Sequence, residues 1–239
     1  MHARFYEGKK KMDLYFDCSN GISTDMVLMA LLDLGADRNF VLRETEKLGL
    51  HERPDEIIKS KEIKSPAHHR KRSFKDIEDI LKNSGLDKST KSMALKIYTV
   101  IAEAEGQVHK KSMDTIHFHE LGRDRAIINI VGVSAALSYL DPHDIYCSEI
   151  HDGCGHIDCA HGRVPVPVPA VRAMMKGTGY RFVQDDIETE MVTPGGLGIL
   201  IGAGASYRKK PKEKEIYKTG IGSGTRDTGR DGLKIHILK

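Results

Sequence analysis

The sequence predicts an α/β fold, in which strands and helices alternate around a mixed sheet and glycine-rich loops lie at strand ends. Three observations support this prediction. Residues 12–18, MDLYFDC, alternate and then run apolar as a buried strand does. A loop over 19–24 and then a helix over 25–35 are predicted to follow, and Gly35 closes the helix. Helical periodicity then dominates the middle of the chain, and strand-like segments return after residue 143.

The middle of the chain is predicted to be mainly helical. Helices are expected over 39–50, 74–85, 87–109 and 125–140. Because the last of these is largely apolar, it is expected to lie at the centre of the domain. Residues 51–72 are polar and interrupted by prolines, which predicts a weak strand or a loop.

Most of the remaining elements are predicted to be strands. They are expected over 144–150, 180–186, 215–224 and 232–238. Residues 165–177 are predicted to start as an extended proline segment and to continue as a helix, because proline suits the first turn of a helix but not its interior.

Composition limits the class of protein. The 239 residues are 39% hydrophobic and 30% charged, with a net charge of +3, which predicts a globular protein of one large domain or two small ones, after a tail over 1–11. No apolar run reaches the roughly 18–20 residues that cross a bilayer, and no signal peptide is recognisable, so we expect a cytoplasmic protein without a membrane partner. Basic and acidic residues are interleaved without a nucleic-acid-binding motif, so no nucleic acid partner is expected. The four cysteines predict free thiols or metal ligands.

Histidines gather in three segments, at 68–69, in HFHE (117–120) and in HDGCGHIDCAHG (151–162). Side chains alternate along a strand, so His117 and His119 would share a face and could bind a divalent metal such as Zn²⁺ or Ni²⁺. The alternative is that one histidine is a hydrogen-bonded core residue and the other is exposed. The spacing within 151–162 does not match a zinc finger. A catalytic Cys159–His161 pair is a further alternative. It would require a lowered pKa of the Cys159 thiol, which a sequence does not show.

Two glycine-rich segments, TPGGLG (193–198) and TGIGSGTRD (219–227), could direct backbone N–H groups at an anion. A helix beginning after Pro194 would add its dipole, and Arg226 could bind a phosphate or carboxylate. Ordinary turns between strands are the alternative.

Two aspartates flank the first predicted loop. Asp17 and Asp25 could hold Mg²⁺ or bind a substrate amine there, although Asp25 could equally be the N-cap of the following helix.

Six motifs, in the same order as in the family, resemble the nickel-insertion protein family LarC. They are LYFDCSNGISTDM (14–26), AHHR (67–70), IHFHELG (116–122), DCAHGRVPVPVPA (158–170), MVTPGG (191–196) and GIGSGTRD (220–227). The run Cys-Ala-His-Gly followed by Pro-x-Pro is specific to the family. The resemblance covers most of residues 12–239.

The resemblance implies insertion of nickel into a pyridinium dithiocarboxylate mononucleotide, the precursor of the nickel pincer cofactor of lactate racemase and related enzymes. Family members deliver nickel to sulfur and carbon donors and hydrolyse CTP with Mn²⁺ or Mg²⁺, which makes them nickel chelatases or cyclometallases of the lyase class. The family continues beyond GTRD into a region associated with CTP. A separate C-terminal polypeptide is therefore expected as a partner, and a homo-oligomer is compatible with the sequence.

Three groups of site residues follow from the motifs and the resemblance. The catalytic group is Asp17, Cys18, Asp25 and Cys159. The cofactor-binding group is Thr193, Gly195, Gly196, Gly222, Gly224 and Arg226. The metal-binding group is His68, His69, His117, His119, Glu120, Cys159 and His161.

The chain departs from the family pattern at particular positions. Thr24 stands where the family usually has glycine, and Arg125 and Asn129 stand where it usually has two aspartates. Two other functions stay open. One is a non-catalytic nickel or zinc metallochaperone, and the other is a divergent metal-dependent hydrolase that uses His117 and His119.

Overall fold

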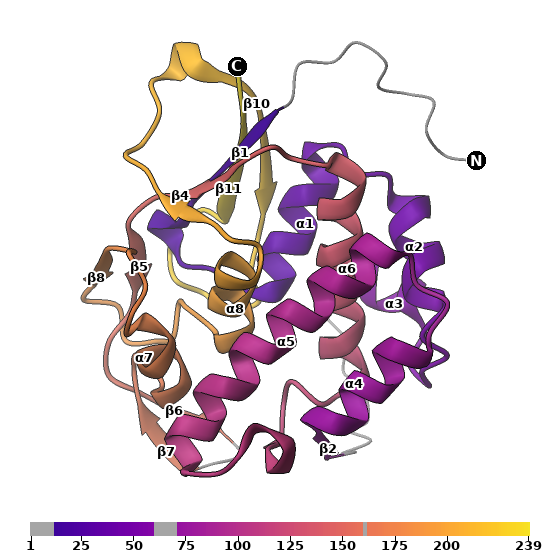
Figure 1. Cartoon of the computed structure of the whole chain (residues 1–239). Helices are drawn as coiled ribbons and strands as arrows, with labels where there is room; N and C mark the ends of the chain where they lie inside the picture. The colour runs from indigo at the N-terminus through magenta and orange to yellow at the C-terminus, as the bar shows by residue number, and fades with distance from the viewer. Residues whose placement is uncertain (1–11, 60–70, 160–161) are drawn as a thin grey trace.

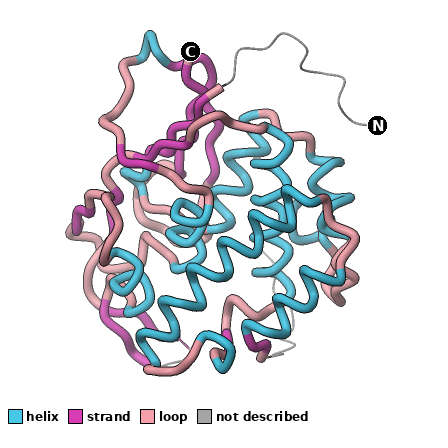
Figure 2. Tube along the Cα trace, in the orientation of Figure 1, coloured by secondary structure: helices cyan, strands magenta, loops and turns pink. Residues whose placement is uncertain are grey.

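The α/β class is confirmed by the arrangement of helices and strands. The computed structural model describes residues 12–59, 71–159 and 162–239. Its longest strands lie together at one end of the molecule, and most helices occupy the rest of it (Figures 1 and 2). The N-terminal tail over 1–11 lies outside the described residues.

The largest sheet among the described residues is mixed and five-stranded, in the order β10-β11-β1-β4-β9. Its strands are β1 (Asp13–Asp17), β4 (Ile145–Cys147), β9 (Ser206–Tyr207), β10 (Ile216–Gly222) and β11 (Leu233–Leu238). β1 runs parallel to β4 and antiparallel to β11, and β4 runs parallel to β9. Leu14, Tyr15 and Phe16 are fully buried, so both faces of the sheet are covered at its central strand.

The described part of the chain between β1 and β4 is mainly helical. Its helices are α1 (Thr24–Leu34), α2 (Arg38–Glu46), α3 (Pro54–Lys59), α4 (Phe74–Asn83), α5 (Lys88–His109) and α6 (Asp124–Leu140). The short strands β2 (Arg72–Ser73) and β3 (His117–Phe118) pair only with each other. The mainly helical character expected for this region is confirmed.

Residues 54–59 form α3, where the sequence predicts a weak strand or a loop. Pro54 is the first residue of this helix, a position where its fixed φ suits helical geometry and its missing N–H is not needed. Proline therefore marks the start of a helix here.

Short local signals set the helix boundaries. Ser23 Oγ accepts the N–H of Met26 at 3.3 Å, so Ser23 rather than Asp25 is the N-cap of α1. Gly35 ends α1 with a φ of 121°, a conformation that side chains disfavour. Ser73 and Asp76 form a capping box at the start of α4.

The apolar helix α6 lies in the core, as its composition predicts. Ile127, Ile128, Ile130 and Val131 are fully buried although they lie on different sides of the helix. α5 packs against both α6 and α8 (Pro194–Gly202; Figure 1).

The C-terminal half contributes shorter elements. They are β5 (Ile150–Asp152), β6 (His156–Cys159), β7 (Gly162–Pro165), α7 (Pro169–Met175), β8 (Phe182–Gln184) and α8 (Pro194–Gly202). The strand expected over 144–150 is divided between β4 and β5, and β5 pairs with β8 outside the main sheet. β6 and β7 form an antiparallel hairpin.

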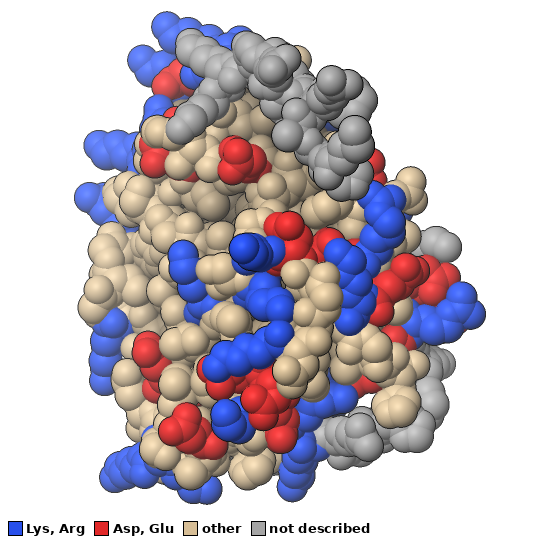
Figure 3. Space-filling view, turned by 45° about the vertical axis from the view of Figure 1, so that its right-hand side comes forward, with Lys and Arg blue, Asp and Glu red and all other residues tan. Residues whose placement is uncertain are grey.

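The surface carries mixed charge. Lys and Arg side chains are interleaved with Asp and Glu over the face in Figure 3. Within the described part of the chain, no helix is long and apolar enough to cross a membrane.

Candidate functional site

A pocket of about 430 Å³ lies where the ends of several elements meet. Its walls come from the first turns of α1, α6, α7 and α8, the last turns of α5, β3, and the β6–β7 hairpin. Figure 1 shows one end of α5 beside β6, β7 and α7. Segments separated by up to about 200 residues in the chain therefore share this cavity, because the helices begin or end there.

Eight of the predicted site residues line this pocket. They are Asp25, His117, His119, Glu120, Cys159, Thr193, Gly195 and Arg226. They come from all three predicted groups, so the fold brings together side chains that the sequence assigns to catalysis, cofactor binding and metal binding. Their individual roles stay predictions.

Helix N-termini add positive potential to a pocket whose lining also carries five acidic residues, Asp25, Glu105, Glu120, Asp158 and Glu190. Ser23 to Asp25, Arg123 to Ala126 and Thr193 to Gly195 lie at the starts of α1, α6 and α8, and each of these stretches contributes to the lining. Backbone N–H groups and the positive end of the helix dipole attract negative charge at such positions. Three arginines, Arg123, Arg125 and Arg226, add formal positive charge.

Asp25 is held by Arg125 and Asn129 from the first turns of α6. Asn129 Nδ2 donates to Asp25 Oδ1 at 2.6 Å, and Arg125 Nη2 lies 3.3 Å from the same oxygen. The three residues also line a second pocket of about 460 Å³, so they stand between the two cavities. An arginine and an amide here neutralise and orient the Asp25 carboxylate, where aspartates would repel it.

The described members of the metal-binding group, His117, His119, Glu120 and Cys159, share the cavity without forming a closed ligand set. His117 is exposed on β3, His119 is partly buried, and the Cys159 thiol lies 3.4 Å from the carbonyl oxygen of Gly162. Among the residues the structure describes, only Asp13, His143 and Asp144 place three donor atoms within 4.8 Å of one another. That group lies at the start of β1 and is not part of the pocket lining.

Glu190 is a pocket residue that the sequence patterns do not identify. Its side chain is buried, and it forms an ion pair with Arg226. Burial raises the pKa of Glu190 above its usual value, although the Arg226 guanidinium opposes the rise. The only sequence signal is an acid placed three residues before the TPGGLG motif.

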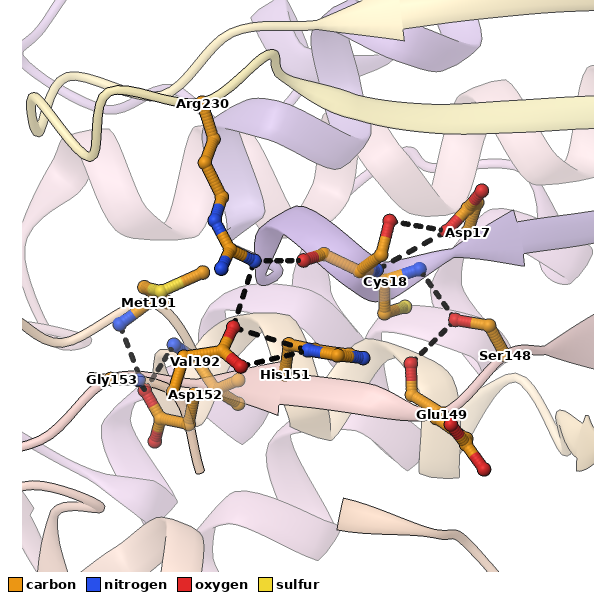
Figure 4. Close-up of polar contacts among 12 residues, drawn as sticks. Asp17, Cys18, Ser148, Glu149, His151, Asp152, Gly153, Met191, Val192 and Arg230 are labelled. Carbon is orange, nitrogen blue, oxygen red and sulfur yellow. Dashed lines mark hydrogen bonds and ion pairs between the residues drawn. The ribbon is translucent and has the colours of Figure 1, made fainter. Parts of the chain in front are cut away.

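Asp17 and Cys18 lie outside the pocket lining, near the end of β1 (Figure 4). The Asp17 carboxylate forms an ion pair with Lys210 at 2.8 Å and accepts a hydrogen bond from Ser19. Burial raises its pKa, but these two partners outweigh burial and leave the pKa below the usual value. Cys18 is fully buried, and burial raises its thiol pKa. We therefore omit both from the proposed site.

Two of the predicted cofactor-binding glycines have a packing role. A Cβ at Gly196 would lie 2.3 Å from the carbonyl oxygen of Ile22, and one at Gly222 would lie 1.9 Å from that of Met26. Only glycine allows the backbone this close an approach. TPGGLG forms the capped start of α8, and residues 219–222 of the second motif belong to β10.

Gly224 lines the second pocket, with Ser223 and Thr225. The remaining predicted ligands, His68, His69 and His161, lie outside the described residues.

Comparison with known proteins decides the family. The profile of the family described as nickel insertion protein matches residues 14–237. The chain belongs to this family. The family resemblance inferred from the six motifs is therefore confirmed. No solved structure matches the chain.

Curated relatives of this nickel insertion family member carry a more specific name. The chain is 41% identical over 236 residues to the pyridinium-3,5-bisthiocarboxylic acid mononucleotide nickel insertion protein of Acetivibrio thermocellus, covering 91% of this chain and 58% of that protein. It is 33% identical to the protein of the same name from Alkaliphilus metalliredigens, covering 95% of this chain and 60% of that protein. The chain thus spans about three fifths of the length of these relatives.

Proposed function

We propose that this chain takes part in inserting nickel into the pyridinium-3,5-bisthiocarboxylic acid mononucleotide, and that the 430 Å³ pocket holds both substrates. One observation carries the proposal: side chains predicted separately to bind metal and to bind an anionic nucleotide line one cavity. The name of the curated relatives supports the choice of substrate.

The pocket side chains suit transfer of a metal. Imidazole and thiolate bind Ni²⁺ well, because affinity for divalent ions rises toward nickel and copper in the series. His117, His119 and Cys159 would capture the ion without enclosing it, since their donor atoms are not arranged as a complete chelate. The two sulfur groups of the nucleotide could then complete the coordination and remove the ion.

The basic and N-terminal parts of the pocket suit the anionic nucleotide. Arg123, Arg125 and the start of α6 would bind its phosphate or its carboxylic acid-derived groups through charge-assisted hydrogen bonds. The metal and the organic substrate would thereby approach one another from different walls.

CTP, together with Mn²⁺ or Mg²⁺, is proposed to bind to a separate C-terminal polypeptide. This polypeptide would correspond to the portion of the relatives that does not align with this chain. With that polypeptide the pocket would act as a nickel cyclometallase of the lyase class. No step in the pocket of this chain is assigned to CTP.

Nickel binding gives the first test. Purified wild type and the His117→Ala/His119→Ala double variant are titrated with Ni²⁺ against a chromophoric chelator. His51→Ala is the matched control, because the His51 side chain is exposed and belongs neither to the pocket lining nor to the Asp13 group. Loss of at least one nickel equivalent in the double variant alone is expected, and unchanged nickel content there would contradict the proposed metal site.

Product formation gives the second test. The chain is combined with Ni²⁺, the nucleotide, CTP with Mg²⁺ or Mn²⁺, and the C-terminal polypeptide of a relative, and the nickelated nucleotide is measured by mass spectrometry. Nickel binding without product in every combination would favour the metallochaperone function.

A further inference from the structure

Glu190 is the most deeply buried carboxylate in the pocket lining, with 5% of its surface exposed. Arg226 Nη1 pairs with Glu190 Oε2 and also donates to the backbone carbonyl oxygen of Glu190 at 3.1 Å. No residue in the described part of the chain bonds to Oε1. One carboxylate oxygen is therefore anchored, and the other is left for a ligand in the pocket.

The backbone around Glu190 is fixed from one side by Asp152. Asp152 Oδ1 accepts hydrogen bonds from the N–H groups of Met191 at 2.8 Å and Val192 at 3.0 Å (Figure 4). A Cβ at Gly153 would lie 1.9 Å from the carbonyl oxygen of Thr189, so the two backbones are in close contact.

The same segment is fixed from the other side by the loop after β1. The N–H of Ile22 donates to the carbonyl oxygen of Met191 at 2.9 Å, and the N–H of Thr193 donates to that of Ile22 at 3.0 Å. Glu190 is thus held in the pocket wall by contacts on both sides of its chain segment. A side chain positioned in this way before the ligand binds is typical of groups that react with the ligand.

The surroundings also make Glu190 a stronger base than an exposed carboxylate. Burial is the largest contribution and raises its pKa, and the negative charges of Asp152 and Glu120 act in the same direction against Arg226. A carboxylate with a raised pKa accepts a proton more readily near neutral pH.

The proposed reaction requires such a base. The name of the substrate places its two sulfur-bearing groups at ring positions 3 and 5, so a nickel ion bound by both sulfurs would lie between them, beside ring carbon 4. That carbon carries a hydrogen, which must leave as a proton for a nickel–carbon bond to form there.

We propose that Glu190 accepts the proton from carbon 4, an inference that rests on the proposed function. The C–H bond breaks heterolytically and its electron pair forms the nickel–carbon bond. The proton passes to Glu190 Oε1, while Arg226 holds Oε2. Nickel stays in the +2 state, so the step needs no oxidant or reductant.

The test compares wild type, Glu190→Gln and Glu190→Asp, with Glu188→Gln as the matched control, because Glu188 is exposed on the same segment outside the pocket. Product formation is measured in the complete mixture with substrate carrying hydrogen or deuterium at carbon 4. Glu190→Gln is expected to lose at least about 100-fold in rate while keeping its nickel affinity and melting temperature. Glu190→Asp is expected to keep some activity and to show a larger deuterium isotope effect than wild type, because proton transfer becomes rate-limiting.

Three results would overturn the role. The first is a rate of product formation by Glu190→Gln equal to that of wild type. The second is a loss of rate that is accounted for by loss of nickel binding or of folding. The third is a deuterium isotope effect in Glu190→Asp no larger than that of wild type. Product from wild type and Glu190→Gln alike would remove only this role. Nickel bound by wild type with no product would remove the proposed function as well.

Discussion

Arg72 and Asp124 form a buried ion pair, with 2.6 Å between Nη2 and Oδ1 and less than a tenth of either side chain exposed. Arg72 also donates to the carbonyl oxygen of Gly122 at 2.6 Å, and Asp124 accepts the N–H of His51 at 2.8 Å. The pair therefore joins β2, the segment before α6 and the segment before α3. It holds the N-terminus of α6 in place, and with it the pocket arginines of that turn.

Removing the cation of this pair should be costly. Arg72→Met is expected to lower the free energy of unfolding by about 3–5 kcal/mol, because Asp124 would be left buried without its partner. Arg53→Met is the control, since the Arg53–Asp55 pair has an arginine that is 68% exposed and a contribution of at most about 1 kcal/mol. Urea denaturation at neutral pH measures both, and equal losses would contradict the structure.

The same pair predicts acid sensitivity. Burial raises the pKa of Asp124, but Arg72 and the N–H groups of Glu52 and His51 outweigh burial and leave the pKa lowered. A carboxylate whose pKa is lower in the folded protein than in the unfolded chain contributes its full stabilisation of the fold above the unfolded-state pKa, about 3.9. That stabilisation is lost as the pH falls through the folded-state pKa. Asp124→Asn should therefore remove part of the fall in stability below pH 4 or so. An acid unfolding profile parallel to wild type would refute this.

Gly195 and Thr24 should be energetically coupled. A Cβ at Gly195 would lie 2.4 Å from Thr24 Oγ1, so Gly195→Ala is expected to lower the free energy of unfolding by about 1–3 kcal/mol. Thr24→Ala removes that oxygen, and the double variant should recover part of the loss. Gly85→Ala is the control, because a Cβ there meets nothing within 4 Å. Thermal denaturation of the four proteins of this cycle measures the coupling, and additive effects would count against it.

The cysteines should differ in reactivity. Cys154 and Cys159 are partly exposed, whereas burial raises the pKa of Cys147 to about 12 and also raises that of Cys18. Because the thiolate is the reactive form, iodoacetamide should modify Cys154 and Cys159 in the folded protein and the other two only after denaturation. Ni²⁺ should protect Cys159, which lines the pocket, and not Cys154. Peptide mass spectrometry measures modification at each cysteine. Equal protection of Cys154 and Cys159 by Ni²⁺ would contradict a nickel site in the pocket.

Much of the local structure follows from patterns within a few residues. The period of apolar residues predicts α5 and α6, and Gly35 marks the end of α1. The start of α3 was not predictable in this way, because Pro54 is compatible with both a loop and the first turn of a helix. Likewise TPGGLG has the composition of a loop, and its glycines are needed because α8 packs tightly against the loop after β1.

Candidate site residues were predictable from the sequence where the residue types and their spacing within one motif indicate the chemistry. His117, His119, Glu120 and Cys159 are recognisable by type and spacing, and they share one cavity. Glu190 was not predictable, because its value as a base comes from burial and from partners at positions 152 and 226. Asp17 lies outside the pocket lining, where Lys210 pairs with it from a distant part of the chain, and this placement was not predictable from its motif.

The sequence by itself determined the α/β class, most helix and strand positions and the family, because these depend on short-range periodicity, turn residues and motifs. Only the tertiary structure decided which motif residues meet. The pocket exists because the starts of α1, α6 and α8 converge at one place, and burial and charge there follow from contacts between segments far apart in the chain.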